Sequence, residues 1–230
     1  MVRDEAKGAA LVSAVGSPCS FMVADLSSGP SISALAESFG VDRPLHALVN
    51  NAAITPTARQ ESAEGVELQW AVNVLGYHRL VKSFLPQLRL AAGEARVVFV
   101  ASFYAGGLRL ADPEFNAAPY SADAAYRASK QANRMLAAAW ASSDQGTGVR
   151  FTSCHPGVAT SNVSLGLGFD LDRSEKAAVS GAQTPLFLAT APADSLENGG
   201  YYADSRLSHC DFCADKAGCN ELFQLCEGMG

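Results

Sequence analysis

The feature that most constrains the fold is the alternation of short apolar runs with helical patterns along the chain. Residues 45–50 and 96–101 are largely apolar runs of strand length, 149–154 is a more mixed run of the same length, and further runs lie at 20–25 and 200–203. Helical patterns fall at 31–39, 65–90, 126–140, 177–190 and 214–227. Strands that are apolar on both faces and alternate with helices indicate a parallel sheet covered on both sides. The sequence therefore predicts an α/β, doubly wound fold in a single domain over residues 1–230.

Composition and charge exclude several classes of protein. The formal net charge is −6 and no run of Lys or Arg offsets it, which argues against nucleic-acid binding. No apolar run approaches the ~20 residues that cross a bilayer. The first seven residues have no apolar core that could form a secretory signal. An intracellular, cytoplasmic protein is the default expectation.

Four of the six cysteines gather near the end of the sequence, at positions 210, 213, 219 and 226. Cys210 and Cys213 have the C-x-x-C spacing of a zinc knuckle, but Cys219 and Cys226 are not spaced as a second ligand pair. We therefore expect reduced thiols and no metal site, as is usual inside cells. A zinc-linked contact module in segment 210–226 is the alternative.

Polar residues close the predicted strands. Asp25, Asn50, Ser102 and the Pro156-Gly157 turn each follow an apolar run. In open α/β sheets, ligands bind at the carboxyl ends of the strands. We therefore expect a binding site where these residues meet.

Tyr126 and Lys130 are four residues apart in segment 126–140, which is rich in helix-forming residues and contains no Gly or Pro. This spacing places both side chains on one face of a helix. A nearby cation favours the charged form of a phenol, so the pair suits proton transfer near neutral pH.

In their order along the chain, these motifs resemble those of the short-chain dehydrogenase/reductase family, with the retinol-dehydrogenase-like branch as the nearest match. The resemblance covers essentially the whole sequence and implies a Rossmann-like fold. It rests on Asp25-Leu26, N-N-A-A from Asn50, Asn73 in V-N-V-L-G, Ser102, Y-x-x-S-K from Tyr126, H-P-G-V from His155, and the tail around residues 199–204 and 220–223.

The resemblance implies a role for each catalytic candidate. Tyr126 would be the general acid in carbonyl reduction, or the base in alcohol oxidation. Lys130 would lower the pKa of the phenol and bind the nicotinamide ribose, and Ser102 would hold the substrate oxygen. Asn73 would anchor a water molecule that connects Lys130 to solvent.

The resemblance also implies a dinucleotide that supplies the redox chemistry. Tyr126 and Lys130 would contact it together with Asp25, Asn50, Ala52, Pro156, Gly157, Val158 and Ser161, with Thr160 as an alternative to Ser161. Arg3 lies near the place where related reductases bind the 2′-phosphate, which favours NADP over NAD. No metal ion is implied.

The glycine-rich opening of the family has no counterpart before Asp25, and segment 8–16 is predicted to be helical. We therefore expect a family member that lacks the first strand, first helix and second strand, with an N-terminus too incomplete for organelle targeting to be assessed. The loss would remove the main pyrophosphate site. It would also expose the strand before Asn50 as an edge, unless the strand before Asp25 closes the gap.

The sequence leaves two functions open. The first is an NAD(P)-dependent oxidoreductase that interconverts a small-molecule alcohol and carbonyl, with a lipophilic substrate implied by the branch resemblance and a substrate loop at 160–176. The alternative is a catalytically inactive remnant that serves as an interaction or regulatory module. Family habit also implies a homodimer through segments 65–90 and 126–140.

Overall fold

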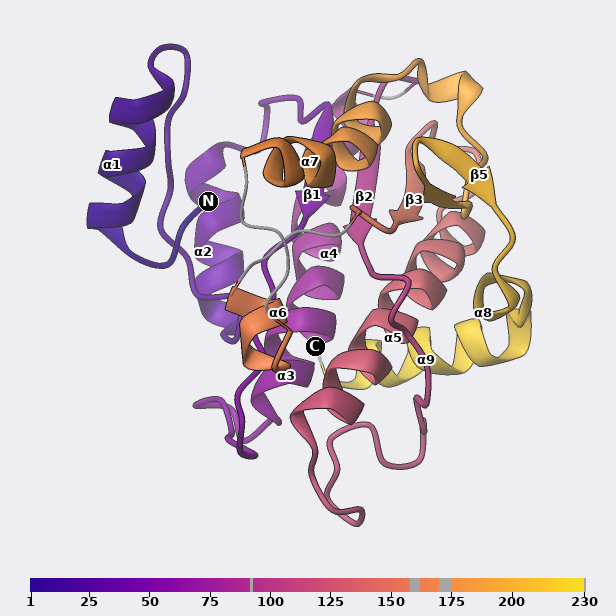
Figure 1. The fold of residues 1–230 in the computed structure, drawn as a ribbon. Helices are drawn as coiled ribbons and strands as arrows, with labels where there is room; N and C mark the ends of the chain where they lie inside the picture. Colours follow the sequence, from indigo (N-terminus) through magenta and orange to yellow (C-terminus); the bar gives the residue numbers. More distant parts are fainter. Residues whose placement is uncertain (92, 158–161, 170–174, 230) are drawn as a thin grey trace.

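The centre of the protein is one five-stranded sheet, seen in a computed structural model that describes residues 1–91, 93–157, 162–169 and 175–229 (Figure 1). The strands lie side by side in sequence order, the first four are parallel, and β5 runs antiparallel to β4. Their bounds are β1 (Ala47–Asn50), β2 (Arg96–Val100), β3 (Arg150–Cys154), β4 (Tyr201–Ala203) and β5 (Arg206–Ser208).

Helices cover both faces of this sheet. In the described residues they are α1 (Glu5–Val15), α2 (Gly29–Phe39), α3 (Leu68–Trp70), α4 (Gly76–Leu90), α5 (Ala122–Ser143), α6 (Asn162–Gly166), α7 (Glu175–Thr190), α8 (Asp211–Ala214) and α9 (Lys216–Gly228). A π-helical turn, η1 (Ala71–Leu75), joins α3 to α4, and a 3-10 turn, η2 (Ala193–Ser195), precedes β4.

The sheet divides the buried core into two parts. On one face, Val97 and Phe99 of β2 pack in a large cluster with side chains of α2, α4, α5 and α9. On the other face, Val98 and Val100 pack with Leu188 of α7 in a smaller cluster. Alternate residues of β2 thus enter opposite layers, as a strand buried on both sides requires. The predicted Rossmann-like α/β fold is confirmed.

The predicted helix at 65–90 differs from the observed one at its beginning. The observed helical run starts at α3, where the Glu67 carboxylate accepts hydrogen bonds from the amides of Gln69 and Trp70. The π-helical turn then interrupts the α-helix, and Pro86 lies inside α4. The predicted C-terminal helix at 214–227 corresponds to α9, and the short helix α8 precedes it.

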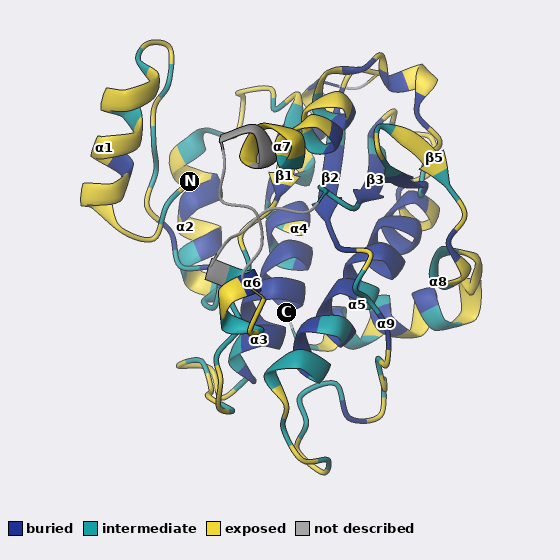
Figure 2. Ribbon diagram, viewed as in Figure 1, coloured by how far each residue is buried: buried dark blue, intermediate teal, exposed yellow. Residues whose placement is uncertain are grey.

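The prediction of a sheet strand at 20–25 is wrong. Only Val23 forms a bridge, with Val2, and the amide of Ala24 donates to the Val2 carbonyl. Instead, a cavity lies between this segment and β1, and it is lined by Met22 of the segment, Leu48 of β1 and the nearby Leu45. The segment therefore has no neighbouring strand with which to form a ladder, and α1 projects beside it as a largely exposed helix (Figure 2).

β1 consequently has one hydrogen-bonded neighbour, β2, within the described residues. Val49 in β1 is 41% exposed, whereas the residues of β2 after Arg96 are buried. The expected raw edge at the strand before Asn50 is therefore present.

α9 covers α4 and α5, the two helices whose segments are expected from the sequence to form a homodimer contact. It packs along α5, and Phe223 of α9 contacts His78 of α4 and Trp140 of α5. Glu227 also binds His78 and Lys82 of α4, each at 2.8 Å. These faces of α4 and α5 are thus buried within the chain. Among the described helices, none combines the length and the apolar character that a membrane span requires.

Candidate active site

α5 brings Tyr126 and Lys130 to the carboxyl ends of the strands. The helix begins after Ser121, whose side chain accepts from the amide of Ala124, and it runs without Gly or Pro to Ser143. The Lys130 ammonium lies 5.6 Å from the centre of the Tyr126 ring. Both side chains line a cleft of about 740 Å³ together with Ala52, Pro156 and Gly157.

Ser102 lies two residues after β2, and its side chain forms a hydrogen bond with the Tyr126 phenol. Its hydroxyl oxygen also accepts from the amide of Tyr104 at 3.0 Å. Ser102 is buried and 8% exposed. The structure therefore places Ser102 against Tyr126, which lines the cleft with Lys130.

The electrostatics of the pair differ from the expectation. Burial raises the pKa of Tyr126, and the hydrogen bond with Ser102 opposes that rise. Burial also lowers the pKa of Lys130 to about 8. Its ammonium donates to the carbonyl of Val100 at 2.8 Å. In the protein alone, desolvation therefore outweighs the attraction that the spacing suggested.

Asn73 lies in the π-helical turn and is fully buried. Its side-chain oxygen accepts from the amide of Ile54 at 2.9 Å, and its side-chain nitrogen donates to the carbonyl of Ile54 at 3.0 Å. The amide thus fixes the loop after β1 against the helix. The role of Asn73 in holding a water molecule stays a prediction.

Asp25 and Arg3 line a second, smaller cavity of about 150 Å³, and Ala52 borders this cavity as well as the cleft. The Asp25 carboxylate also accepts from the amide and hydroxyl of Ser27 at 2.9 and 2.8 Å, so it stabilises a turn. Asn50 is 2% exposed, and neither polar atom of its side chain has a hydrogen-bond partner among the residues that the structure describes.

Gly157 brings the turn after β3 against α7. Its φ is +102°, and a Cβ there would lie 3.6 Å from the Cα of Gly181. Gly181, Ala178 and Ala182 of α7 line the cleft on this side. Of the other predicted binding residues, Val158 and Ser161 lie outside the described residues, as do Thr160 and parts of the 160–176 loop.

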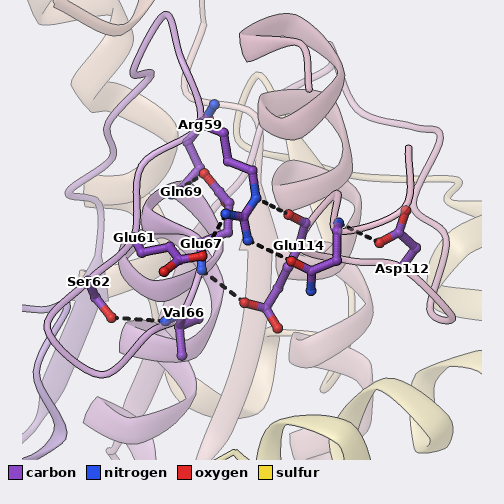
Figure 3. A network of polar contacts seen from close by, with 9 residues as sticks. Arg59, Glu61, Ser62, Val66, Glu67, Gln69, Asp112 and Glu114 are labelled. Atoms are coloured by element: carbon purple, nitrogen blue, oxygen red, sulfur yellow. Dashed lines mark hydrogen bonds and ion pairs between the residues drawn. The ribbon is translucent and has the colours of Figure 1, made fainter. Parts of the chain in front are cut away.

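The long connection between Ser102 and Tyr126 is tied to the start of the helical run that carries Asn73 (Figure 3). Arg59 donates to the carbonyl of Glu114 at 3.1 Å and to the side chain of Asn116 at 2.6 Å. The Glu114 carboxylate accepts from the amide of Glu67 at 2.9 Å. This network holds two loops of the site in a fixed relation.

Sequence reasoning missed two groups of residues beside the candidate site. Arg134 donates to the backbone carbonyl of Ser102, and its position four residues after Lys130 on the same helix could have indicated it. Phe103 directly follows Ser102 and is 61% exposed, which is unusual for a large apolar side chain in a buried region. Its ring lies 4.9 Å from that of His155.

A nicotinamide dinucleotide fits the two cavities in part. Ala52 and Gly157 let the backbone approach a ligand closely, whereas Asn50 lines neither cavity and is buried beside the cleft residue Asn51. In the described part of the chain, no glycine-rich turn leads from a sheet strand into a helix beside β1. The residues present therefore fit the two ends of such a molecule better than its pyrophosphate.

Comparison with known proteins identifies relatives of this chain. The chain is 36% identical to human retinol dehydrogenase 12 over 191 residues, which cover 79% of this chain and 60% of the relative. It is 32% identical to mouse polyprenol dehydrogenase, covering 88% of this chain and 66% of that protein. The chain thus spans about 60% of the length of the retinol dehydrogenases 12 that it matches.

Solved structures share the fold. An uncharacterised protein from Mycobacterium paratuberculosis superposes with a TM-score of 0.78 at 24% identity, covering 100% of this chain and 82% of the other. An NADPH-bound carbonyl reductase from chicken fatty liver gives a TM-score of 0.62 at 21% identity, with coverage of 87% and 82%. The family model for short chain dehydrogenases matches residues 1–167. The chain belongs to the short-chain dehydrogenase family.

Proposed function

We propose that this protein is an NAD(P)-dependent oxidoreductase that interconverts an alcohol and a carbonyl. The observation that carries the proposal is the position of Tyr126 and Lys130 in one cleft, with the side chain of Ser102 against the Tyr126 phenol. A phenol in contact with a serine hydroxyl, beside a buried ammonium group, can transfer a proton to or from a substrate oxygen.

Each residue of this group has a defined task. In the direction of reduction, the Tyr126 hydroxyl donates its proton to the oxygen that becomes the alcohol, and Ser102 donates a hydrogen bond to that oxygen. Lys130, with a pKa near 8, can exchange a proton with its surroundings close to neutral pH. Asn73 keeps the loop after β1 in place through Ile54. A bound dinucleotide would supply the hydride.

Residues of both cavities would hold the dinucleotide. We assign the nicotinamide end to Pro156 and Gly157 in the cleft, and the adenine end to Asp25 and Ala52, with the buried Asn50 directly before the cleft residue Asn51. Arg3 borders the same small cavity as Asp25, where a guanidinium could pair with a 2′-phosphate. This arrangement favours NADP over NAD. Val158 and Ser161 complete the proposed set.

A lipophilic substrate is supported by apolar side chains near Ser102. Phe103 is 61% exposed and Phe169, after α6, is 43% exposed. The Phe169 ring lies 5.8 Å from that of Tyr104, and Phe103 and His155 are also in ring contact. Exposed aromatic side chains gathered beside a cleft are typical of sites for apolar ligands. The relatives named as retinol and polyprenol dehydrogenases agree with this choice.

A second candidate function is a non-catalytic interaction module. It is favoured by β1, which has one sheet neighbour among the described residues and lacks a glycine-rich turn beside it. Binding of the dinucleotide separates the two functions, because the module requires none.

The deciding experiment titrates the purified chain with NADPH and NADH and then measures reduction of a long-chain unsaturated aldehyde. We expect NADPH to bind more tightly and Tyr126→Phe to lower kcat by about 10²–10⁴-fold with little change in dinucleotide affinity. Tyr120→Phe is the matched control, since that hydroxyl binds Gln69 and the carbonyl of Pro56 instead. Absence of dinucleotide binding would favour the interaction module, and equal kcat in Tyr126→Phe would exclude the proposed chemistry.

A further inference from the structure

Arg134 is a buried cation with an unusual set of partners. It is 8% exposed and donates to the carbonyl of Ser102 and, at 2.9 Å, to the hydroxyl of Tyr201. Its guanidinium also lies 3.8 Å from the centre of the Tyr201 ring. Within the described ranges, no carboxylate forms an ion pair with it. A buried cation is costly unless an opposite charge accompanies it.

The missing counter-charge lies in the C-x-x-C motif. Arg134 approaches the Cys210 sulfur at 3.8 Å, and the Cys213 thiol forms a side-chain hydrogen bond with Cys210. Cys213 also approaches the backbone carbonyl of Arg134, at 3.5 Å. Both thiols are free. One guanidinium therefore links a pair of adjacent thiols to the backbone of Ser102.

The two thiols share one proton near neutral pH. The hydrogen bond from Cys213, assisted by Arg134, lowers the pKa of Cys210 to about 6. The same hydrogen bond and burial raise the pKa of Cys213. The pair thus combines an anionic sulfur with a protonated neighbour, as thiol–disulfide exchange requires.

We propose that Cys210 and Cys213 form an oxidisable dithiol that positions Ser102 through Arg134. The co-reactant is a low-molecular-weight disulfide such as glutathione disulfide. The Cys210 sulfur attacks one of its sulfurs, the disulfide bond breaks, and one thiol leaves. Cys213 then gives up its proton and attacks Cys210, forming the internal disulfide and releasing the second thiol. Two protein thiols are oxidised and one disulfide is reduced. The released thiols take up the proton of Cys213 and one proton from solvent, which replaces the proton that Cys210 has already lost.

Oxidation removes the charge that accompanies Arg134. A disulfide sulfur is a neutral, weak acceptor, so the guanidinium loses its counter-ion while it remains bound to Ser102 and Tyr201. We expect Arg134 to reorganise and the backbone at Ser102 to loosen, which misplaces the hydroxyl beside Tyr126. Arg134 is therefore a positioning residue for the proposed reaction.

The first test measures thiol chemistry and does not depend on enzymatic activity. The rate of Cys210 alkylation by iodoacetamide, followed by peptide mass spectrometry, should rise with a midpoint near pH 6. In Arg134→Gln the midpoint should move up, with about tenfold less thiolate at pH 7. A wild-type midpoint at the ordinary ~8.5 would overturn the proposed thiolate–guanidinium pair.

The second test uses glutathione disulfide. We expect the native chain to lose two hydrogens as a Cys210–Cys213 disulfide forms, and Cys19→Ser to behave in the same way. Cys213→Ser should stop at a mixed disulfide on Cys210. Formation of no internal disulfide in the correctly folded protein, as checked by circular dichroism, would overturn the proposal.

The third test concerns coupling to Ser102. Oxidation should increase amide hydrogen exchange in segment 101–105 and lower kcat several-fold, and dithiothreitol should reverse both changes. Cys213→Ser treated in the same way should also lose activity, because a mixed disulfide on Cys210 removes the same charge, and dithiothreitol should restore it. Unchanged exchange in a fully disulfide-bonded sample would overturn the coupling, even if the chain proved to have no oxidoreductase activity.

Discussion

Lys130 shows how strongly the fold controls the chemistry of a single side chain. Its spacing from Tyr126 suggested mutual stabilisation of two charges, yet Lys130 is 2% exposed and its ammonium binds the Val100 carbonyl. Desolvation disfavours the charged forms of both residues, so it lowers the pKa of the lysine and raises that of the phenol. The protonation states of Tyr126 and Lys130 therefore depend more on burial than on the distance between the two side chains.

The lowered pKa of Lys130 predicts a pH dependence of stability. Between about pH 8 and pH 10.5 the unfolded chain retains a proton that the folded protein has lost. The unfolded state then binds more protons, so this group makes the free energy of unfolding rise with pH, by on the order of 3 kcal/mol across the window. As pH falls through 8, that contribution is lost.

Urea unfolding at several pH values checks this expectation. The difference between wild type and Lys130→Met isolates the lysine from other titrating groups. Gln131→Met, on the same helix and without an ionisable group, should keep the wild-type slope. An identical slope in Lys130→Met would contradict the prediction.

Substitution of Asn73 should lower the free energy of unfolding, independently of any catalytic role of this residue. Asn73→Ala removes both hydrogen bonds to the backbone of Ile54 and leaves the amide and carbonyl of Ile54 without these partners. We expect a loss of about 1–3 kcal/mol in the free energy of unfolding, measured in urea. Asn220→Ala on the exposed side of α9 should change it by less than about 0.5 kcal/mol.

At the level of elements, the π-helical turn is the feature on which the N-terminal part of the site depends. The amide of Gly76 donates to the carbonyl of Ala71, five residues earlier, and α4 resumes from there. Gly76 also allows the segment around Leu26 to lie directly on the helix. The turn thus positions the Asp25 loop as well as Asn73.

Gly76→Ala should therefore destabilise the protein. A Cβ at this position would lie 2.6 Å from the carbonyl oxygen of Leu26, a backbone atom that cannot rotate away. We expect a loss of about 1–3 kcal/mol, seen as a lower urea midpoint. Gly228→Ala, where a Cβ meets nothing within 4 Å, should cause no loss. Equal midpoints for the two variants would contradict this account.

The elements also show what a sequence can reveal. The patterns of β2, β3 and α5 predicted these elements well, and the strand-end argument placed Ser102 at the carboxyl end of β2. Segment 20–25 has the same apolar character, but a strand requires a partner that the pattern does not specify. Arg134 and Cys210 are 76 residues apart, so only the folded chain reveals their contact.

At the level of the whole molecule, the sheet is unevenly protected. β2 and β3 each lie between two strands, whereas β1 has β2 alone as its partner in the described residues. In a parallel ladder, amides of one strand point alternately to its two sides. About half of the β1 amides therefore face away from the sheet.

Hydrogen exchange monitored residue by residue should reflect this asymmetry. We expect the outward-facing amides of β1 to exchange at least about tenfold faster than those of β3, because exchange there needs only local opening. The inward-facing amides of β1 provide the internal control. Uniform protection across β1 and β3 would show that another segment covers this edge.

The contact between Gly157 and Gly181 has a consequence for how such a protein can diversify. One wall of the cleft consists of small residues of α7, so its width is set by side chains that are short or missing. Enlarging a residue on that wall would narrow the entrance while the proton-transfer groups stay untouched. Ligand size can thus be selected independently of reactivity.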